Sequence, residues 1–501
     1  MPPEITAQRL ASAMPLDRYQ LRGVLGADVP SGVRPITAVT HDSRAVGPDS
    51  VFVAIRGFTS DGVKFVPEAL ARGAVLVVAE RDLPGVPTVV VPDARAALAR
   101  LAVAVAGDPS RQVLVYGVTG TNGKTTSSYV LHAILSAADG PDTAGLMTTT
   151  EIVVGRERQD AVRTTDEAPK IQNNLARMRD TGVRHVVLET SSHGIHLQRV
   201  AGTRYAAALF TNLTPDHLDL HGTMEHYYRT KRRLFEWARG PKLANQDDSY
   251  GRRLAAEVGG TLTFGVSARA DYRINAERAE LGGTAFELAT PRHGTLTVRT
   301  PLLGDYNVHN VAGAAALALE IGISPATVVD AVAQMAQVPG RFERIPAAVE
   351  RGFEVVVDYA HTDIGLAAVL EVARKVAVTH GRNSKVICVY GATGDRDRAK
   401  RPLMGEVASR MADIGIITTD DAYAEDPRAI ATEVAAGADM SCTTVVIDRR
   451  EAIAQALRQG CPGDVIVVAG KGHERIQHLP SGDVDFHDGT VIAELLGEAS
   501  N

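Results

Sequence analysis

The chain has 501 residues, 45% of them hydrophobic and 22% charged, and its formal net charge is −6. This length exceeds what one hydrophobic core supports and predicts about three domains. The acidic balance and the dispersed lysines and arginines exclude a basic surface for nucleic acid.

The sequence also indicates where the protein works. Its N-terminus lacks a basic segment followed by an apolar one, and no window reaches the ~18 apolar residues of a membrane span. Cys388, Cys442 and Cys461 are far apart and form no CxxC pair, as is typical of incidental thiols in a reducing compartment. We therefore expect a cytoplasmic monomer with no membrane insertion.

The predicted elements, taken in chain order, indicate an α/β fold of three domains. Residues 1–108 hold short strand-like runs separated by one or two helical patterns, which predicts a small α/β domain. Residues 109–340 begin with an apolar run, a glycine-rich loop and a helix-like stretch, and end near an alanine-rich helix. Residues 341–501 alternate Val- and Ile-rich strands with helix-length patterns, which predicts a parallel, doubly wound, Rossmann-like sheet.

The glycine-rich loop GTNGKTT predicts a phosphate site. A strand that leads through glycines into a helix N-terminus favours an anion, because backbone N–H groups and the helix dipole point at it. Lys124 would neutralise phosphate, and the Thr125 hydroxyl suits Mg²⁺. Val118 stands where the common GxxxxGK[ST] loop has its first glycine. We expect an ATP site formed here by Gly120, Thr121, Asn122, Gly123, Lys124, Thr125 and Thr126.

Three further features leave alternatives open. Glu189 ends an apolar run, where a carboxylate is costly unless it binds metal or forms a structural ion pair. His217 and His221 have the spacing of a zinc-binding pair, but no glutamate follows His217 as HExxH requires. Ser191 and His193 suggest nucleophilic catalysis, but such close neighbours rarely have the required geometry and GxSxG is absent.

Seven motifs, in order, resemble the Mur ligase family, the ATP-dependent amino-acid ligases of peptidoglycan precursor synthesis. They are GTNGKTT (120–126), ETSSHGIHLQRV (189–200), FTNLTPDHLDLHG (210–222), GDYNVHN (304–310), VDYAH (357–361), GDRDRAKRP (394–402) and AGKGHE (469–474). The resemblance spans nearly the whole chain and is greatest for the MurE type, which attaches the third residue of the stem peptide. It implies that ATP converts a carboxylate into an acyl phosphate, which an incoming amine then attacks.

The resemblance implies a catalytic set of Lys124, Glu189, His217 and Lys231. Thr125, Glu189 and His217 would be Mg²⁺ ligands or near neighbours of the ion. Lys231 has the sequence context of a solvated helix lysine, but the matching family position carries a lysine that CO₂ carbamylates and that ligates metal. The implied cofactors are therefore ATP, Mg²⁺ and CO₂.

The remaining motifs imply substrate contacts. Asn307, Asn310, Arg341, Asp358 and His361 match nucleotide contacts, although Asn307 could instead cap the helix after it. The positions that match contacts to the UDP-linked substrate in the first two domains are His41, Ser43, Phe58, Thr59, Ser60, Thr164, Thr165, Ser191, Leu197 and Arg199. The family often has glutamine in place of Leu197 and proline in place of Asp166, so this chain departs from the pattern there.

The third domain would select the amino acid. Arg401 matches the residue that pairs with the α-carboxylate, and Gly470 and Glu474 match contacts to the distal end. The specificity segment reads DNPR in ligases for meso-diaminopimelate, whereas this chain has Asp420, Asp421, Ala422 and Tyr423. Two acids without a cation would repel a second carboxylate, so we expect L-lysine or L-ornithine, with meso-diaminopimelate as the alternative.

Competing hypotheses concern the acceptor and the activity. Arg428 lies close enough in sequence to replace the missing arginine. The expected substrates are UDP-MurNAc-L-Ala-D-Glu and a diamino acid. A folylpolyglutamate synthetase shares the phosphate loop but normally begins with the ATPase domain, so residues 1–108 argue against it. A Mur-like ligase with a different acceptor and a non-catalytic Mur-like binding protein are the other hypotheses.

Overall fold

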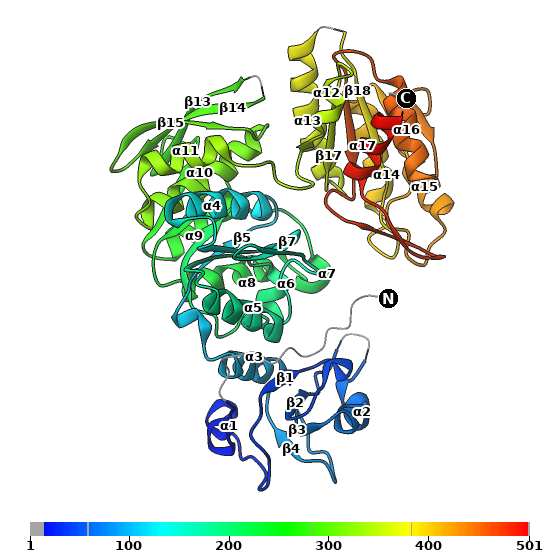
Figure 1. The fold of residues 1–501 in the computed structure, drawn as a ribbon. Helices are drawn as coiled ribbons and strands as arrows, with labels where there is room; N and C mark the ends of the chain where they lie inside the picture. Colours follow the sequence, from blue (N-terminus) through cyan, green and yellow to red (C-terminus); the bar gives the residue numbers. More distant parts are fainter. Residues whose placement is uncertain (1–14, 58–59, 281, 382, 499–501) are drawn as a thin grey trace. The chain divides into compact units, whose positions relative to one another are not determined.

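The computed structural model describes residues 15–57, 60–280, 282–381 and 383–498 (Figure 1). The chain forms two compact units. The first runs to Glu280 and continues through Thr284–Thr300 and Asp305–Met335, and the second holds Pro301–Gly304 and the chain from Ala336 onward.

The first unit begins with a small domain built on a parallel sheet in the order β1-β2-β3-β4. Its strands are β1 (Ala38–Thr40), β2 (Ser50–Val53), β3 (Ala74–Ala79) and β4 (Thr88–Val90). Its helices are α1 (Arg18–Leu25), η1 (Ser43–Ala45), η2 (Gly62–Phe65), α2 (Val66–Ala71) and α3 (Ala94–Val105). Asp93 caps α3, and the buried face of this helix packs Leu98 and Leu101 against Val51 and Val78 of the sheet.

The same unit contains an eleven-stranded sheet in the order β15-β14-β13-β12-β11-β10-β5-β9-β6-β7-β8. Neighbouring strands from β13 to β6 in this order pair in parallel. Three pairs nearer the two edges are antiparallel, namely β14 with β15, β6 with β7, and β7 with β8. The strands are β5 (Leu114–Thr119), β6 (Ala144–Met147), β7 (Glu151–Val154), β8 (Glu157–Asp160), β9 (His185–Glu189), β10 (Tyr205–Phe210), β11 (Lys242–Asn245), β12 (Thr261–Gly265), β13 (Tyr272–Glu280), β14 (Gly283–Thr290) and β15 (Gly294–Thr300).

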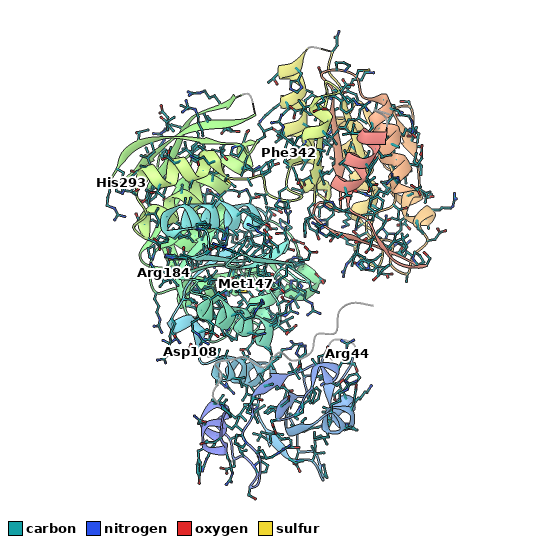
Figure 2. All side chains as sticks on the ribbon, in the orientation of Figure 1. Arg44, Asp108, Met147, Arg184, His293 and Phe342 are labelled. Carbon is teal, nitrogen blue, oxygen red and sulfur yellow. The ribbon has the colours of Figure 1, made fainter. Side chains whose placement is uncertain are left out.

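Helices cover the central part of this sheet. They are η3 (Pro109–Arg111), α4 (Lys124–Asp139), α5 (Ala168–Asp180), α6 (Ser192–His196), α7 (Leu218–His221), α8 (Met224–Trp237), α9 (Ser249–Glu257), α10 (Asp305–Glu320) and α11 (Pro325–Gln334). The helix α4 packs against α10 and α11, whereas α8 packs against α6 and α7 (Figure 1). Asp108, which precedes η3, has a left-handed φ of 47° and pairs with Arg111 and Arg204 (Figure 2).

The register of this sheet decides which loops meet. Val118 of β5 lies beside Glu189 of β9, and Thr119 lies beside Phe210 of β10. Because the three strands are parallel, their carboxyl ends share one edge of the sheet. The phosphate loop, the residues after Glu189 and the residues after Phe210 therefore come together.

The second unit contains a six-stranded sheet in the order β16-β17-β21-β18-β19-β20, in which only the β16–β17 pair is antiparallel. Its strands are β16 (Glu343–Arg344), β17 (Glu354–Asp358), β18 (Val386–Tyr390), β19 (Ile414–Ile417), β20 (Thr443–Val445) and β21 (Val465–Ala469), with a separate hairpin of β22 (Ile476–Leu479) and β23 (Gly482–Asp485). Its helices are α12 (Pro346–Val349), α13 (Asp363–His380), α14 (Lys400–Met411), α15 (Pro427–Ala435), α16 (Arg449–Gln459) and α17 (Asp488–Glu498). The carboxyl ends of β17, β21, β18 and β19 carry the loops that hold the predicted third-domain site.

The structure confirms the α/β fold with three domains, each with its own sheet. The last continuous stretch of the compact second unit starts at Ala336, and the predicted third domain starts at residue 341. The two N-terminal domains form one unit, since Ala168 of α5 packs into the core of the first. Among the described residues, no helix is both long and apolar enough to cross a membrane.

Candidate active site

The phosphate loop links β5 to α4 in a shape that requires glycine at two positions. Gly120 and Gly123 have φ of 153° and 81°, in the region that favours glycine. A Cβ on Gly120 would lie 1.9 Å from Thr211 Oγ1, and one on Gly123 would lie 2.1 Å from Asn310 Oδ1. Gly123 is the N-cap of α4, so the helix N-terminus opens directly at the loop.

The residues that follow β10 form hydrogen bonds with this loop. Thr121 N donates to Asn212 O at 2.9 Å, and Asn122 N donates to Asn212 Oδ1 at 2.9 Å. Thr211 Oγ1 donates to Asn122 O at 2.6 Å. Sequence reasoning assigned no role to Thr211 or Asn212, although both lie in the motif FTNLTPDHLDLHG. Thr126 follows on α4 and is buried, so it contributes packing next to the loop.

Thr125 and Glu189 form an oxygen-rich pair behind the loop. Thr125 Oγ1 donates to Glu189 Oε2 at 3.1 Å, and the same carboxylate oxygen accepts from Thr149 N at 3.2 Å. Glu189 is 1% exposed. Lys231 lies close enough to interact electrostatically with Glu189, while the hydrogen bonds to the carboxylate come from a hydroxyl and a backbone amide. Hydroxyl and carboxylate oxygens are the donors that Mg²⁺ prefers.

Lys231 is buried, contrary to the solvated position that its sequence context suggests. Its side chain projects from α8, and Nζ donates to Gly120 O at 2.7 Å and lies 4.8 Å from the centre of the Tyr227 ring. Burial and, less strongly, the charge of Lys124 lower the pKa of Lys231 well below its usual value. Lys124 Nζ donates to Thr121 O at 2.8 Å. Both lysines thus contact carbonyl groups of the phosphate loop.

His217 lies at the start of α7 in a strained conformation. Its φ is 52°, its ring lies 4.6 Å from that of His193, and Nε2 lies 3.3 Å from Asp216 Oδ2. Burial lowers the pKa of His217, and the charges of Lys124 and Lys231 lower it further, which favours the neutral imidazole. Among the described residues, no group of three or more His, Cys, Asp and Glu side chains is arranged to hold a metal.

Residues matched to the muramyl substrate connect to Glu189 through Thr165. Thr165 Oγ1 donates to Glu189 O at 2.9 Å and accepts from Ser191 N at 2.9 Å. Arg199 donates to Thr165 O at 3.1 Å and pairs with Glu167 at 2.8 Å. These contacts place the predicted substrate residues beside the predicted metal residue.

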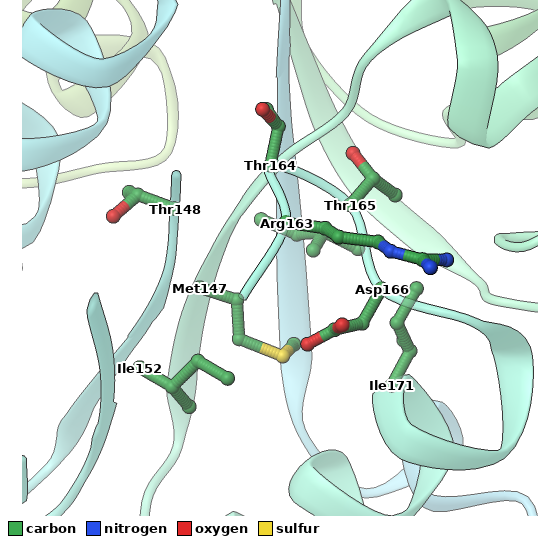
Figure 3. A pocket seen from close by; sticks show the side chains of 9 residues that line it. Met147, Thr148, Ile152, Arg163, Thr164, Thr165, Asp166 and Ile171 are labelled. Carbon is green, nitrogen blue, oxygen red and sulfur yellow. The ribbon is translucent and has the colours of Figure 1, made fainter. Parts of the chain in front are cut away.

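A small pocket adjoins this network (Figure 3). Its lining includes Thr164, Thr165 and Asp166, together with Arg163 and the apolar Met147. Thr164 Oγ1 donates to Thr149 Oγ1 at 3.2 Å, so the threonine pair reaches the loop that also contacts Glu189. Asp166, which replaces the usual proline, pairs with Lys170 at 2.9 Å.

Ser191 caps a helix. Its Oγ accepts from Gly194 N at 3.0 Å at the start of α6, which removes the basis for a serine nucleophile. Leu197, at the position where the family often has glutamine, is buried at the end of the same helix. The next residue, Gln198, has a φ of 59° and donates to Asp93 Oδ2 at 2.6 Å.

The N-terminal domain contributes less of the predicted site. Ser43 Oγ donates to Glu68 Oε2 at 2.8 Å, and Ser60 O accepts from Gly57 N at 2.8 Å. His41 Nδ1 is buried without a hydrogen-bond partner, and burial lowers the pKa of this imidazole. Phe58 and Thr59 lie outside the described residues.

Asn310 reaches the phosphate loop from α10. Its side chain lies against Gly123, and its Nδ2 donates to Asn307 Oδ1 at 3.1 Å. Asn307 is buried within the first turn of α10, which begins at Asp305, so the alternative that Asn307 is the N-cap is wrong.

Three predicted nucleotide residues meet around Tyr359 in the second unit. The Arg341 guanidinium lies 4.8 Å from the Tyr359 ring centre, and the His361 ring lies 4.9 Å from it. Asp358 accepts from Phe342 N at 2.7 Å and from Ala360 N at 2.8 Å. Burial raises the pKa of Asp358, and Arg341 partly offsets this.

Arg401 occupies a different environment from the one expected. Its side chain has no solvent exposure and pairs with Glu425 at 2.7 Å and Glu433 at 2.8 Å. It also donates to Thr393 O at 3.2 Å. These contacts use both terminal nitrogens of the guanidinium, whereas Nε is buried without a hydrogen-bond partner, so the pairs give Arg401 a structural role and its contact with an α-carboxylate stays a prediction. Arg396 in the same loop is exposed and lies 5.8 Å from the Tyr423 ring centre.

The specificity segment has a buried cation beside its acids. Asp420 and Asp421 are buried, and Lys471 Nζ donates to Asp421 Oδ1 at 2.9 Å and to Glu474 Oε2 at 3.1 Å. The argument that two acids face the amino acid without a cation is therefore wrong. Gly470 packs on Asp420, since a Cβ there would lie 2.8 Å from Asp420 Oδ2.

Backbone contacts attach this segment to the β22–β23 hairpin. Ala422 N donates to His478 O at 2.8 Å, and the Tyr423 and His478 rings stack at 5.0 Å. Tyr423 has a left-handed φ of 49°. Arg428, the candidate replacement cation, is exposed in the first turn of α15.

Family models match all three domains. The model "Mur ligase family, catalytic domain" matches residues 35–106, "Mur ligase middle domain" matches 118–318, and "Mur ligase, glutamate ligase domain" matches 340–472. The fold and the phosphate site thus define an ATP-dependent ligase.

Relatives that match nearly the whole chain indicate which type of ligase this is. A UDP-N-acetylmuramoyl-L-alanyl-D-glutamate–2,6-diaminopimelate ligase from Geobacillus thermodenitrificans is 42% identical over 480 residues, which cover 92% of this chain and 95% of the relative. The enzyme of that name from Streptomyces avermitilis is 38% identical and covers 97% of each chain. A solved structure of a ligase of the same name has a TM-score of 0.68 and 30% identity, and covers 97% of this chain and all of that one. The chain belongs to the Mur ligase family and is of the MurE type.

Proposed function

We propose that the protein joins a diamino acid to UDP-MurNAc-L-Ala-D-Glu as the third residue of the peptidoglycan stem peptide. The γ-phosphate of ATP passes to the free carboxylate of the dipeptide. The amine of the amino acid then attacks the acyl carbon, phosphate leaves with the bonding electrons, and the amine loses a proton. The supporting observation is that Thr165 joins the residues matched to the muramyl substrate to Glu189, behind the phosphate loop.

The loop residues account for phosphate binding. The N-terminus of α4, which opens after Gly123, attracts an anion, and Lys124 adds a positive charge. Asn310 beside Gly123 fits a contact to the nucleotide from α10. Phosphoryl transfer depends mainly on positioning and charge neutralisation, which this arrangement supplies without a protein nucleophile.

Thr125 and Glu189 fit Mg²⁺, because their oxygen atoms lie 3.1 Å apart in a buried setting beside the loop. Bound there, Mg²⁺ would neutralise charge on the transferred phosphate. His217 offers a neutral imidazole nearby. Mg²⁺ takes few protein ligands when phosphates and water complete its shell, so a large carboxylate cluster is not required.

Lys231 fits carbamylation by CO₂. Burial lowers the pKa of Lys231 and so favours the neutral amine, whose nitrogen lone pair can attack the CO₂ carbon with release of one proton. The product carries a carboxylate at the position of Nζ, next to Gly120 O. Intact mass spectrometry of protein kept under CO₂ should show the mass of one added CO₂ in wild type and not in Lys231→Ala. An unmodified lysine in fully active protein would contradict this.

The amino acid favoured by the relatives is a diaminopimelate rather than lysine or ornithine. The argument for lysine and ornithine took the two acids to have no cation beside them, whereas Lys471 pairs with Asp421 and interacts with Asp420. The relatives at 42% and 38% identity are named for 2,6-diaminopimelate. We therefore propose meso-diaminopimelate as the third residue, recognised by a segment that differs from DNPR.

ADP release tests the proposed reaction. We expect ADP only when ATP, UDP-MurNAc-L-Ala-D-Glu and the amino acid are all present, because the acyl phosphate is consumed only by the amine. ADP release that ignores the UDP-linked substrate would contradict the proposal. ADP release that needs this substrate but no tested amino acid would indicate a different acceptor.

A further inference from the structure

Lys471 is a buried cation in the predicted amino-acid site. It follows β21 by two residues, and its side chain has no solvent exposure. Its ammonium donates to Asp421 Oδ1 at 2.9 Å, Glu474 Oε2 at 3.1 Å and Ile476 O at 2.7 Å. An ammonium has three protons, so these acceptors use its full capacity. The sequence motif AGKGHE contains this lysine, but motif matching assigned it no role.

The two carboxylates depend on Lys471 to different degrees. Asp421 Oδ1 also accepts from His478 N at 2.9 Å, so the hairpin holds Asp421 independently. Glu474 is about one-third exposed, at 32% of its side chain, and its other oxygen accepts from Tyr359 OH at 3.3 Å. Lys471 is therefore the cation in contact with Glu474, and the tyrosine contact is long for an O–H···O bond.

The surroundings hold more carboxylates than cations. Arg449 is buried in a bidentate pair with Asp488, with both distances 2.7 Å, and Asp420 lies close enough to interact with Arg449 and Lys471. The carboxylates of Asp420, Asp421, Glu474 and Asp488 thus outnumber the cations Lys471 and Arg449. A buried excess of negative charge attracts a cationic group. Glu474, as the partly exposed member, is the carboxylate that a ligand can reach.

We propose that Lys471 is a positioning residue for the amino acid, which fixes the Glu474 carboxylate so that it binds the distal ammonium of the diamino acid. This inference rests on the proposed function. Lys471 does not touch the amino acid, because its three protons bind Asp421, Glu474 and Ile476 O.

The charge of Lys471 has a measurable consequence for Glu474. Burial raises the pKa of Glu474 to about 7, Lys471 lowers it, and Asp421 and Asp420 raise it. The other titratable groups that face the Glu474 carboxyl are Tyr359 and Tyr423. Removal of the Lys471 charge deletes the lowering influence, so the pKa of Glu474 rises further. Near neutral pH the carboxyl then carries a proton, and it ionises again as pH increases.

The test compares Lys471→Met with wild type by the KM for meso-diaminopimelate from about pH 6 to about pH 9, near the pKa of Glu474. We expect the KM to rise about tenfold or more at neutral pH, as for loss of a buried charge contact. The ratio of the two KM values should fall toward one at high pH, because Glu474 recovers its charge. The titration of the amino acid itself affects both KM values equally, so it cancels in the ratio of the variant KM to the wild-type KM. The KM for ATP and for the UDP-linked substrate should stay within about twofold.

Two further variants keep the test decisive. Glu474→Gln cannot ionise, so its KM ratio to wild type should rise with pH rather than fall. Lys375→Met, an exposed lysine of α13 paired with Glu371, is the matched control and should leave each KM unchanged. An unchanged KM and pH profile in folded Lys471→Met, or wild-type pH dependence in Glu474→Gln, would overturn the inference. Wild type without ligase activity would instead overturn the proposed function.

Discussion

The phosphate-loop region and the amino-acid region differ in how the protein treats its charges. At the phosphate loop, Lys124 and Lys231 donate to backbone carbonyl groups, and the glycines cannot carry a side chain. In the amino-acid region, Arg401, Arg449 and Lys471 contact carboxylates that neutralise them. The first region presents a helix N-terminus and a lysine, which favour an anionic ligand, whereas the second holds these cations in ion pairs within the protein.

Substitution of Lys124 should have the largest effect of those considered. Lys124→Met removes the charge at the start of α4, and ligation should fall about a hundredfold or more, since loss of one positioned electrostatic contact costs that much. ADP release measures it, with thermal unfolding to confirm the fold and Lys375→Met as control. Activity near that of wild type would show that the loop does not bind the transferred phosphate.

The substitution Gly123→Ala should have the second-largest effect on activity. An alanine at φ 81° costs about 1–2 kcal/mol, and its Cβ would meet Asn310 Oδ1 at 2.1 Å. We expect the KM for ATP to rise about tenfold, because Asn310 and the loop must separate. Gly259→Ala is the matched control, since its position is open and has an ordinary φ. An unchanged KM for ATP would place the nucleotide elsewhere.

Arg401→Met should affect stability more than substrate binding. Loss of the guanidinium leaves Glu425 and Glu433 without their buried partner, which should cost about 2 kcal/mol, a reduced figure because both glutamates are partly exposed. Urea unfolding measures this, and Arg458→Met, from an exposed pair with Glu451, should change stability by less than about 0.5 kcal/mol. A stable Arg401→Met protein with a greatly raised KM for the amino acid would restore the α-carboxylate role.

Tyr423→Gly should have the smallest effect. Glycine relieves a left-handed strain of roughly 1–2 kcal/mol, while the lost stacking on His478 costs about 0.5–1.5 kcal/mol. The free energy of unfolding should therefore change little, and the KM for the amino acid should shift by about threefold or less. Tyr423→Phe keeps the ring and should match wild type. A large loss of stability in the glycine variant would mean that the stacked ring supports the whole loop.

The phosphate site could be predicted from the sequence because its parts are local. Gly120, Gly123, Lys124 and Thr125 lie within one turn, and their spacing predicts both the backbone shape and the charge. Glu189 could be placed beside them because it ends a strand of a parallel sheet. The burial of Lys231 could not be predicted, since it depends on where α8 packs.

The amino-acid region was predicted less well because its charges pair over long sequence distances. Lys471 and Asp421 are 50 residues apart, and Arg401 lies 24 residues from Glu425 and 32 from Glu433. The segment from Asp420 to Tyr423, considered alone, shows two acids and no cation. Only the folded chain shows that Lys471 lies beside them, and the relatives named for 2,6-diaminopimelate favour that amino acid over lysine and ornithine.

The mass of the product from one competition reaction tests the central claim most directly. Wild-type protein would receive ATP, UDP-MurNAc-L-Ala-D-Glu and an equimolar mixture of meso-diaminopimelate, L-lysine and L-ornithine. We predict that the UDP-linked product carries diaminopimelate. A product that carries lysine or ornithine, or no UDP-linked product at all, would contradict the account.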